Sequence, residues 1–312
     1  IIDSTENNQG KIECIETIIG IRNTDKANIE IISGTINNSC SNSYIDIYGI
    51  YNNDGSVSVA GGVINNNAND YSDSYGIYNN NGTVKIISGS VNSKCGYGTS
   101  SNNSNTYGIY NEGNGIIEVL GGEVNSSSSY NSYSYGIYNK DGGSIKIVDG
   151  VINNSCTNRY AYAYAIYNKS NGDVKIENGT INCTSEGHGY GVYNDNVGNV
   201  KVTGGTINSF GRSFNDGIYN NDNGTIIVEK GKIIANSSSM ECCGINNNTT
   251  GTIIIGIKGD GIVSKEEPYI KGEYTGTKYE GYGIKNIKGK LYFYDGKIEG
   301  TTKAVYDTIT EK

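Results

Sequence analysis

Seven tyrosines at one position of a repeated pentapeptide are the most regular candidates for binding chemistry. The pentapeptide YGIYN begins at Tyr48, and close variants of it follow along the chain as far as Asp216. The tyrosines after its aliphatic residue are Tyr51, Tyr78, Tyr110, Tyr138, Tyr167, Tyr193 and Tyr219. A tyrosine ring offers a flat apolar surface and a polar hydroxyl, so this row predicts an aromatic platform for a glycan or a protein partner. The alternative is a stacked ladder that only stabilises the fold.

A second tyrosine series precedes the glycine of the pentapeptide. Its members are Tyr48, Tyr75, Tyr107, Tyr135, Tyr164, Tyr190 and Tyr282. The series is interrupted at Asp216 and Cys243. We expect these rings to pack at a corner where a loop enters a strand.

Residues suited to catalysis are sparse and come from three consecutive loops. Arg159 lies on the first loop, Glu186 and His188 lie on the second, and Arg212 lies on the third. His188 is the only histidine of the chain, and a histidine within hydrogen-bond reach of a substrate can act as general acid or base. Glycoside hydrolysis uses two carboxylates at a set separation, and no pair of adjacent aspartates occurs. We therefore expect no enzymatic activity, with an exposed histidine as the simpler interpretation.

Charge and cysteine content exclude other classes of function. The net charge of −8 disfavours nucleic acid as a partner, because phosphate contacts need clustered lysine and arginine. Apolar runs such as 253–255 are too short to span a bilayer, so we expect no membrane insertion. Lys146, Lys175 and Lys201 recur at one position and indicate a weak anion site or ordinary solvated surface. The seven cysteines lack CxxC spacing, which favours small buried hydrophobes and no metal or cofactor.

These residues belong to a repeat that runs through nearly the whole chain. Its anchor glycine, or an alanine in its place, recurs roughly every 27 residues, a period typical of solenoid proteins. Each repeat holds three short apolar segments of the kinds GIYN, VKI and GGxIN, followed by a polar loop of variable length. Aliphatic residues alternate with polar ones in these segments, which indicates short strands with one buried face.

The repeat predicts an all-β fold, a right-handed parallel β-helix with three short strands per turn and about ten to eleven turns. We expect one domain over 1–312, with an irregular N-terminal cap at 1–19, regular turns at 20–255, an insertion at 256–282 and the last turns at 283–312. The aliphatic residue after each anchor is expected to form a core column. An asparagine two residues later, such as Asn52 and Asn79, is expected to form a hydrogen-bonded ladder at a bend.

The segments GIYN, VKI and GGxIN resemble the repeats of right-handed parallel β-helix proteins of the pectate-lyase-like superfamily, especially the tandem-repeat regions of secreted or surface proteins of Firmicutes. That superfamily includes polysaccharide lyases, hydrolases, phage tailspikes and non-catalytic adhesins, so the resemblance implies a fold and not one activity.

Together, the repeat and the resemblance predict a non-catalytic extracellular rod of a bacterial cell surface. Its partner is expected to be a glycan or a surface protein, bound through loops and the tyrosine row. We further expect the C-terminal end either to continue into further sequence or to stack end to end on another copy, forming a filament, because open strand edges invite pairing. The alternative is a carbohydrate-active enzyme or a phage tailspike on the same scaffold.

Overall fold

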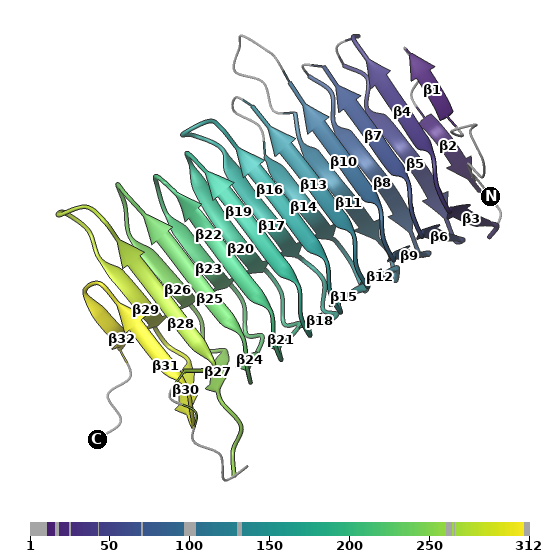
Figure 1. The fold of residues 1–312 in the computed structure, drawn as a ribbon. Coiled ribbons are helices and arrows are strands. Elements are labelled where there is room, and N and C mark those ends of the chain that lie inside the picture. Colours follow the sequence, from purple (N-terminus) through teal and green to yellow (C-terminus); the bar gives the residue numbers. More distant parts are fainter. Residues whose placement is uncertain are drawn as a thin grey trace.

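The chain winds into a parallel β-solenoid in which strands of successive turns lie side by side along one axis (Figure 1). The computed structural model describes residues 11–15, 19–24, 26–42, 44–69, 71–96, 104–129, 133–259, 264 and 266–308. These residues form strands and connecting turns without a helix. The fold expected from the repeat is therefore confirmed as an all-β parallel solenoid with three strands in each turn.

Three parallel sheets, named here by a residue type on their outer faces, make up the solenoid. The tyrosine sheet contains β2 (Ile19–Asn23), β5 (Ile47–Asn53), β8 (Ser74–Asn80), β11 (Thr106–Glu112), β14 (Ser134–Asn139), β17 (Tyr162–Asn168), β20 (His188–Asn194), β23 (Asn215–Asn220), β26 (Cys242–Asn247), β29 (Gly281–Asn286) and β32 (Lys303–Asp307). The lysine sheet contains β3 (Asn28–Ile31), β6 (Ser56–Val59), β9 (Thr83–Ile86), β12 (Ile116–Val119), β15 (Ser144–Ile147), β18 (Val174–Ile176), β21 (Val200–Val202), β24 (Ile226–Val228), β27 (Thr252–Ile255) and β30 (Lys290–Phe293). The asparagine sheet contains β1 (Lys11–Ile15), β4 (Thr35–Cys40), β7 (Val63–Ala68), β10 (Ser90–Cys95), β13 (Glu123–Ser128), β16 (Val151–Cys156), β19 (Thr180–Ser185), β22 (Thr206–Gly211), β25 (Lys232–Ser237), β28 (Tyr269–Tyr274) and β31 (Lys297–Gly300).

Each turn runs through the tyrosine, lysine and asparagine sheets in that order. In the described residues this gives ten complete turns, from β2–β4 to β29–β31, with β1 and β32 beyond them. The predicted count of ten to eleven turns is close to this value. At about 4.8 Å between neighbouring strands the rod is roughly 50 Å long, and its first and last turns lie at opposite ends (Figure 1).

Aliphatic side chains from all three sheets fill the interior in stacked columns. Equivalent residues pair across turns, as Ile109 does with Ile137 and Ile137 with Ile166. All three side chains have no exposed surface and belong to one continuous core cluster. The expected aliphatic column is confirmed, because a register set by buried β-branched residues cannot slip by one position without turning them to solvent.

The predicted asparagine ladder is also confirmed, and it lies inside the solenoid. Its members are Asn23, Asn52, Asn79, Asn111, Asn139, Asn168, Asn194, Asn220, Asn247 and Asn286, all buried. From Asn23 to Asn247, each Nδ2 donates to the Oδ1 of the asparagine in the next turn over 2.7–2.9 Å. Asn286 donates to Asp307 at 3.3 Å. The same amide also donates to a backbone carbonyl at the bend, as Asn52 does to Gly55 at 3.0 Å. We call this row the inner asparagine ladder.

The glycine of the pentapeptide interrupts the alternation of the strand. In a regular strand, residues three apart point to opposite faces, yet the rings of Tyr48 and Tyr51 lie on one face with centroids 5.6 Å apart, while Ile50 is in the core. A Cβ on Gly49 would lie 2.5 Å from the carbonyl oxygen of Gly76 in the next turn, so side chains are disfavoured there. Alanine holds this position at Ala165 and Ala304. Both tyrosines therefore face outward.

Two predicted boundaries need correction. The stretch 1–19 was expected to be an irregular cap, but β1 pairs in register with β4 and β2 begins at Ile19. Residues 1–10 and 16–18 lie outside the described part of the chain. The expected insertion at 256–282 contains β28, which pairs with β25 and β31 as the third strand of its turn.

Among the described residues, no helix is long and apolar enough to cross a membrane.

Candidate functional site

The seven predicted binding tyrosines form one outer column of the tyrosine sheet. Successive rings from Tyr51 to Tyr219 stack with centroids 4.9–5.1 Å apart and planes within 8° of parallel. We call this row from Tyr51 to Tyr219 the second tyrosine column, because another column precedes it along the strands. Inside the column, each ring face is covered by the neighbouring ring. A ligand lying along the column would therefore meet ring edges and hydroxyls, and not the flat faces expected from the sequence.

The tyrosines before the glycine form a first tyrosine column beside the second one. Their rings stack at 4.8–5.2 Å from Tyr48 to Tyr190. Edge-to-face contacts join the two columns, as between Tyr107 and Tyr110 at 5.1 Å. These rings were expected at a corner, but they lie within strands such as β11. The glycine between the two tyrosines turns both of them to the same face of the strand.

Acidic side chains hold several of the tyrosine hydroxyls. The hydroxyl of Tyr167 donates to Asp195 at 2.6 Å, and that of Tyr78 donates to Glu112. Burial, followed by the charge of Glu112, raises the pKa of Tyr110 to about 12. The Tyr110 hydroxyl thus stays protonated at neutral pH. The Tyr78 and Tyr167 hydroxyls, which already donate, keep lone pairs that can accept a hydrogen bond.

His188 belongs to a third outer column, which lies three residues before the anchor glycine. Its ring stacks on Tyr162 at 4.5 Å and on Phe214 at 5.2 Å. Burial lowers the pKa of His188, so its ring is neutral at neutral pH. Glu186, Arg159 and Arg212 are exposed, and no described hydrogen bond or ion pair joins them to His188. The structure therefore does not bring the four predicted residues together.

The three stacked lysines Lys146, Lys175 and Lys201 form ion pairs with glutamates of the chain itself. Glu177 pairs with both Lys146 and Lys175, at 3.4 and 2.6 Å, and Lys201 pairs with Glu229 at 2.6 Å. The glutamates follow the strands of the lysine sheet, so each can reach a lysine of its own turn or the preceding one. The stacked lysines thus need no external anion to offset their mutual repulsion.

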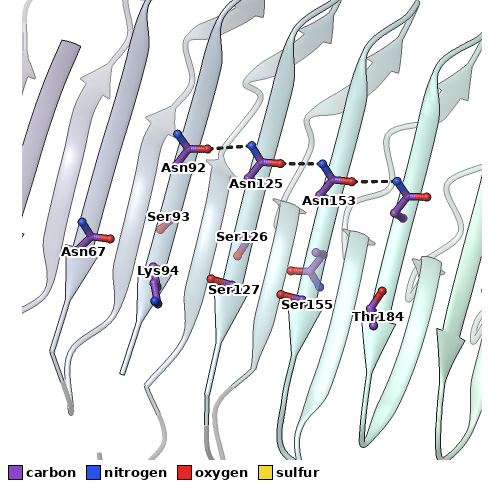
Figure 2. A pocket seen from close by; sticks show the side chains of 12 residues that line it. Asn67, Asn92, Ser93, Lys94, Asn125, Ser126, Ser127, Asn153, Ser155 and Thr184 are labelled. Atoms are coloured by element: carbon purple, nitrogen blue, oxygen red, sulfur yellow. Dashed lines mark hydrogen bonds between the residues drawn. The ribbon is translucent and has the colours of Figure 1, made fainter. Parts of the chain in front are cut away.

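A polar groove lies on the outer face of the asparagine sheet (Figure 2). Its volume is about 370 Å³, and asparagine, serine and threonine side chains line most of it. An outer asparagine ladder crosses it, formed by Asn37, Asn65, Asn92, Asn125, Asn153, Asn182 and Asn208 with Nδ2–Oδ1 distances of 2.7–3.0 Å. The sequence analysis missed this ladder, although the N of each GGxIN segment marks it.

A second cavity lies where the three aromatic columns stop. The first column ends at Tyr190, and Asp216 takes its position in the next turn. The other two columns end one turn later, where Asn246 follows Tyr219 and Glu241 follows Phe214. These side chains are shorter than the rings they replace, and a cavity of about 360 Å³ remains beside them. We call this cavity the ring gap. Lys285, His188 and Asn248 also line it.

The ring gap holds a buried carboxylate without a cationic partner among its described hydrogen bonds. Asp216 is 5% exposed, and its two oxygens accept hydrogen bonds from the backbone N–H of Cys243 at 3.0 Å and from Nδ2 of Asn246 at 3.1 Å. Burial raises the pKa of Asp216 to about 7. The neighbouring Glu241 is already paired with Lys285. The sequence analysis missed this cluster, although the first column changes residue type at Asp216 and the other two change in the next turn.

The cysteines are internal, as predicted. The six whose side chains the structure describes, Cys40, Cys95, Cys156, Cys183, Cys242 and Cys243, are buried free thiols. Burial raises the pKa of Cys183 and of Cys242 to about 12, which suppresses the reactive thiolate. Within the described residues, no group of three or more histidine, cysteine, aspartate or glutamate side chains is arranged to hold a metal ion.

Comparison with known proteins found no protein-family model, no curated protein and no solved structure that matches the chain.

Proposed function

We propose that the chain is a non-catalytic, extracellular rod of a bacterial surface that binds a glycan or a surface protein along its sides. One observation carries the proposal. The outer faces repeat the same hydrogen-bonding groups at the spacing of one turn, as a row of tyrosine hydroxyls on one sheet and a row of asparagine amides on another. Such rows suit a ligand that itself repeats along its length.

The outer asparagine ladder has hydrogen-bonding capacity left for a ligand. Each amide has two N–H donors and an oxygen with two lone pairs. The Asn125 amide donates to Asn92 at 2.8 Å and to Glu123 at 3.1 Å, and its oxygen accepts from Asn153 at 2.8 Å. The second lone pair remains for the hydroxyls of a glycan, and the neighbouring serines of the groove add donors and acceptors.

The cellular location and the lineage depend on the resemblance of the repeats to those of secreted or surface proteins of Firmicutes. Membership of the pectate-lyase-like superfamily is likewise a proposal that depends on this resemblance. A rod about ten turns long with polar sides is suited to extending a binding surface away from a cell.

Two triple variants test the proposal. Changing Tyr110, Tyr138 and Tyr167 to phenylalanine removes hydroxyls while keeping the stacked rings. Changing Asn92, Asn125 and Asn153 to alanine removes the amides of the groove. We expect at least one triple variant to bind bacterial cells or a glycan array about tenfold more weakly, with an unchanged circular dichroism spectrum. Undiminished binding by both variants, or no binding by the wild-type chain, would contradict the proposal.

The alternative enzyme on the same scaffold is tested by incubating the purified chain with a panel of polysaccharides. We expect no loss of chain length, because His188 is stacked between two rings and has no described hydrogen bond or ion pair with the charged residues of the loops. Cleavage that disappears in a His188→Ala variant would contradict the non-catalytic rod and show that the chain is a carbohydrate-active enzyme.

A further inference from the structure

The ring gap exposes aromatic surface that the rest of the columns covers. Inside the second tyrosine column a ring such as Tyr193 is stacked on both sides, by Tyr167 at 5.1 Å and Tyr219 at 4.9 Å. Tyr219 is stacked on one side only, and the residue in register on its other side is Asn246. Because an asparagine side chain is shorter than a tyrosine, the outer part of this ring face lines the cavity.

The opposite end of the same column shows which chemical group can cover such a ring face. Arg22 is in register with Tyr51, the first ring of the column. Its guanidinium carbon lies 5.5 Å from the centroid of that ring. A guanidinium is planar and positively charged, so it stacks on the negative face of a phenol ring.

The charges around the gap favour a cation over an anion or a neutral group. Glu241 and Lys285 neutralise each other, and the Lys285 amino group lies 5.7 Å from the Tyr282 ring centroid, in the turn beyond Tyr219 and Asn246. His188 is neutral because burial lowers its pKa. With Asp216 ionised, the gap holds two carboxylates and one lysine, a net charge of −1. The described hydrogen bonds to Asp216 come from neutral donors, and Lys285, which attracts it, is already paired with Glu241. A buried charge without an opposite charge is costly, so a bound cation would stabilise it.

We infer that the ring gap binds a guanidinium group, as carried by an arginine side chain of a partner polypeptide, stacked on the free face of Tyr219 and paired with the carboxylate of Asp216. A carboxylate and a guanidinium form strong charge-assisted hydrogen bonds. This inference is independent of the glycan-binding proposal, which concerns the sides of the rod.

The test uses the whole chain and small probes in a ligand-observed nuclear magnetic resonance titration. The probe is N-acetyl-arginine N-methylamide, and its citrulline counterpart is the uncharged control of nearly equal shape. We expect saturable binding of the arginine probe, and binding of the citrulline probe that is about tenfold weaker or less. A panel of methyl glycosides is titrated in parallel.

Two variants locate the site. Asn246→Tyr continues the second tyrosine column with its own residue type and fills the gap, and Asp216→Asn removes the charge while keeping the shape. We expect each variant to weaken binding of the arginine probe by about tenfold or more. The matched control is Arg22→Tyr, which introduces a tyrosine into the same column at its far end and is expected to leave binding unchanged.

Binding is also expected to depend on pH. Protonation of Asp216 removes the negative charge, whereas the guanidinium stays charged throughout. Binding should therefore strengthen from pH 5 to pH 8 in the wild type, and this dependence should be absent in Asp216→Asn. Glu241, Lys285 and His188 also face the gap and are present in both proteins, so the comparison isolates Asp216.

Four results would overturn the inference: no saturable binding of the arginine probe, equal binding of the citrulline probe, undiminished binding by Asn246→Tyr, or binding of methyl glycosides in place of the arginine probe. Circular dichroism and thermal unfolding verify that each variant is folded. A variant that does not fold is replaced by Tyr219→Leu, which removes the ring face and is expected to give the same loss of binding.

Discussion

Asparagines of one turn serve two different purposes according to the side of the strand on which they lie. Asn139 is buried and belongs to the inner asparagine ladder, where it donates to Asn168 at 2.9 Å and accepts from Asn111 at 2.8 Å. Asn153 makes the same kind of bonds on the outer face, next to solvent. Water can replace a lost partner only at the outer position.

We expect Asn139→Ala to destabilise the fold far more than Asn153→Ala. Loss of the Asn139 side chain leaves a buried donor on Asn111 and a buried acceptor on Asn168 unpaired, each costing about 1–3 kcal/mol. The outer substitution should cost less than about 1 kcal/mol. Denaturant unfolding monitored by circular dichroism measures both values, and similar losses would show that the burial of the inner ladder contributes little.

Adjacent residues Ile137 and Tyr138 test the inward and outward assignment. Ile137→Asp places an unpaired charge in the core column and should cost several kcal/mol with local unwinding. Tyr138→Ser removes an outward ring stacked on Tyr110 and Tyr167, which costs less because each aromatic pair contributes on the order of 1 kcal/mol beyond its buried area. Equal losses of thermal stability in the two variants would contradict the assignment.

At the scale of the strand, the turn formed by β23 and its neighbours differs from the turns before it. Asp216 stands where six preceding turns of the described chain, from Tyr48 to Tyr190, place a stacked tyrosine, and it is buried between β20 and β26. A buried carboxylate is stabilised in its protonated form, so this turn carries a stability cost that the regular turns lack.

The raised pKa of Asp216 predicts a stability change with pH. Its folded pKa is about 7 and its ordinary value is 3.8, so between these values the folded state binds more protons than the unfolded state. The free energy of unfolding should therefore fall as pH rises from 4 to 7, by on the order of a few kcal/mol, and then level off. Asp216→Asn should lack this fall.

The measurement is denaturant unfolding of both proteins at pH 5 and pH 8. His188 contributes in the opposite direction, because its lowered pKa makes stability rise through its titration range. Subtracting the variant from the wild type removes that contribution. An equal pH dependence in the two proteins would show that Asp216 ionises in the fold as it does in the unfolded chain.

At the scale of the whole molecule, the rod has apolar surface at its last described turn. Val305 is 36% exposed and Phe293 is 51% exposed, whereas the equivalent residues of the preceding turn, Ile284 and Ile255, have no exposed surface. The outward edge of β32 has no strand beside it among the described residues. This end therefore presents both a strand edge and apolar side chains to a further turn.

We expect head-to-tail association of copies through this end, visible as concentration-dependent sedimentation in an analytical ultracentrifuge. Val305→Lys places a charge on the exposed column and should weaken association by about tenfold or more. Leu120→Lys, at a residue that is 38% exposed on the side of the rod, is the control and should leave association unchanged. Monomers at all concentrations, or equal weakening by the control, would contradict this expectation.

Most of the scaffold could be predicted from the sequence, because its signals are local and repeat. Aliphatic residues such as Ile50 and Ile77 alternate with polar ones, which identifies strands with one buried face, and their period requires equivalent residues to stack. The same reasoning predicted the inner asparagine ladder from Asn52 and its equivalents. Glutamates outside the strand pattern were not assigned, so the ion pair of Glu177 with Lys175 was missed.

The sequence by itself determined the solenoid, its three strands per turn, its core columns and its buried thiols, because burial of β-branched residues at period two leaves one register. The tertiary structure alone decided the surface. It placed Tyr48 and Tyr51 on the same face through the break at Gly49, turned ring faces toward one another, and opened the ring gap at Asp216. These features depend on side-chain direction and on contacts between turns, and neither follows from the order of residues within one repeat.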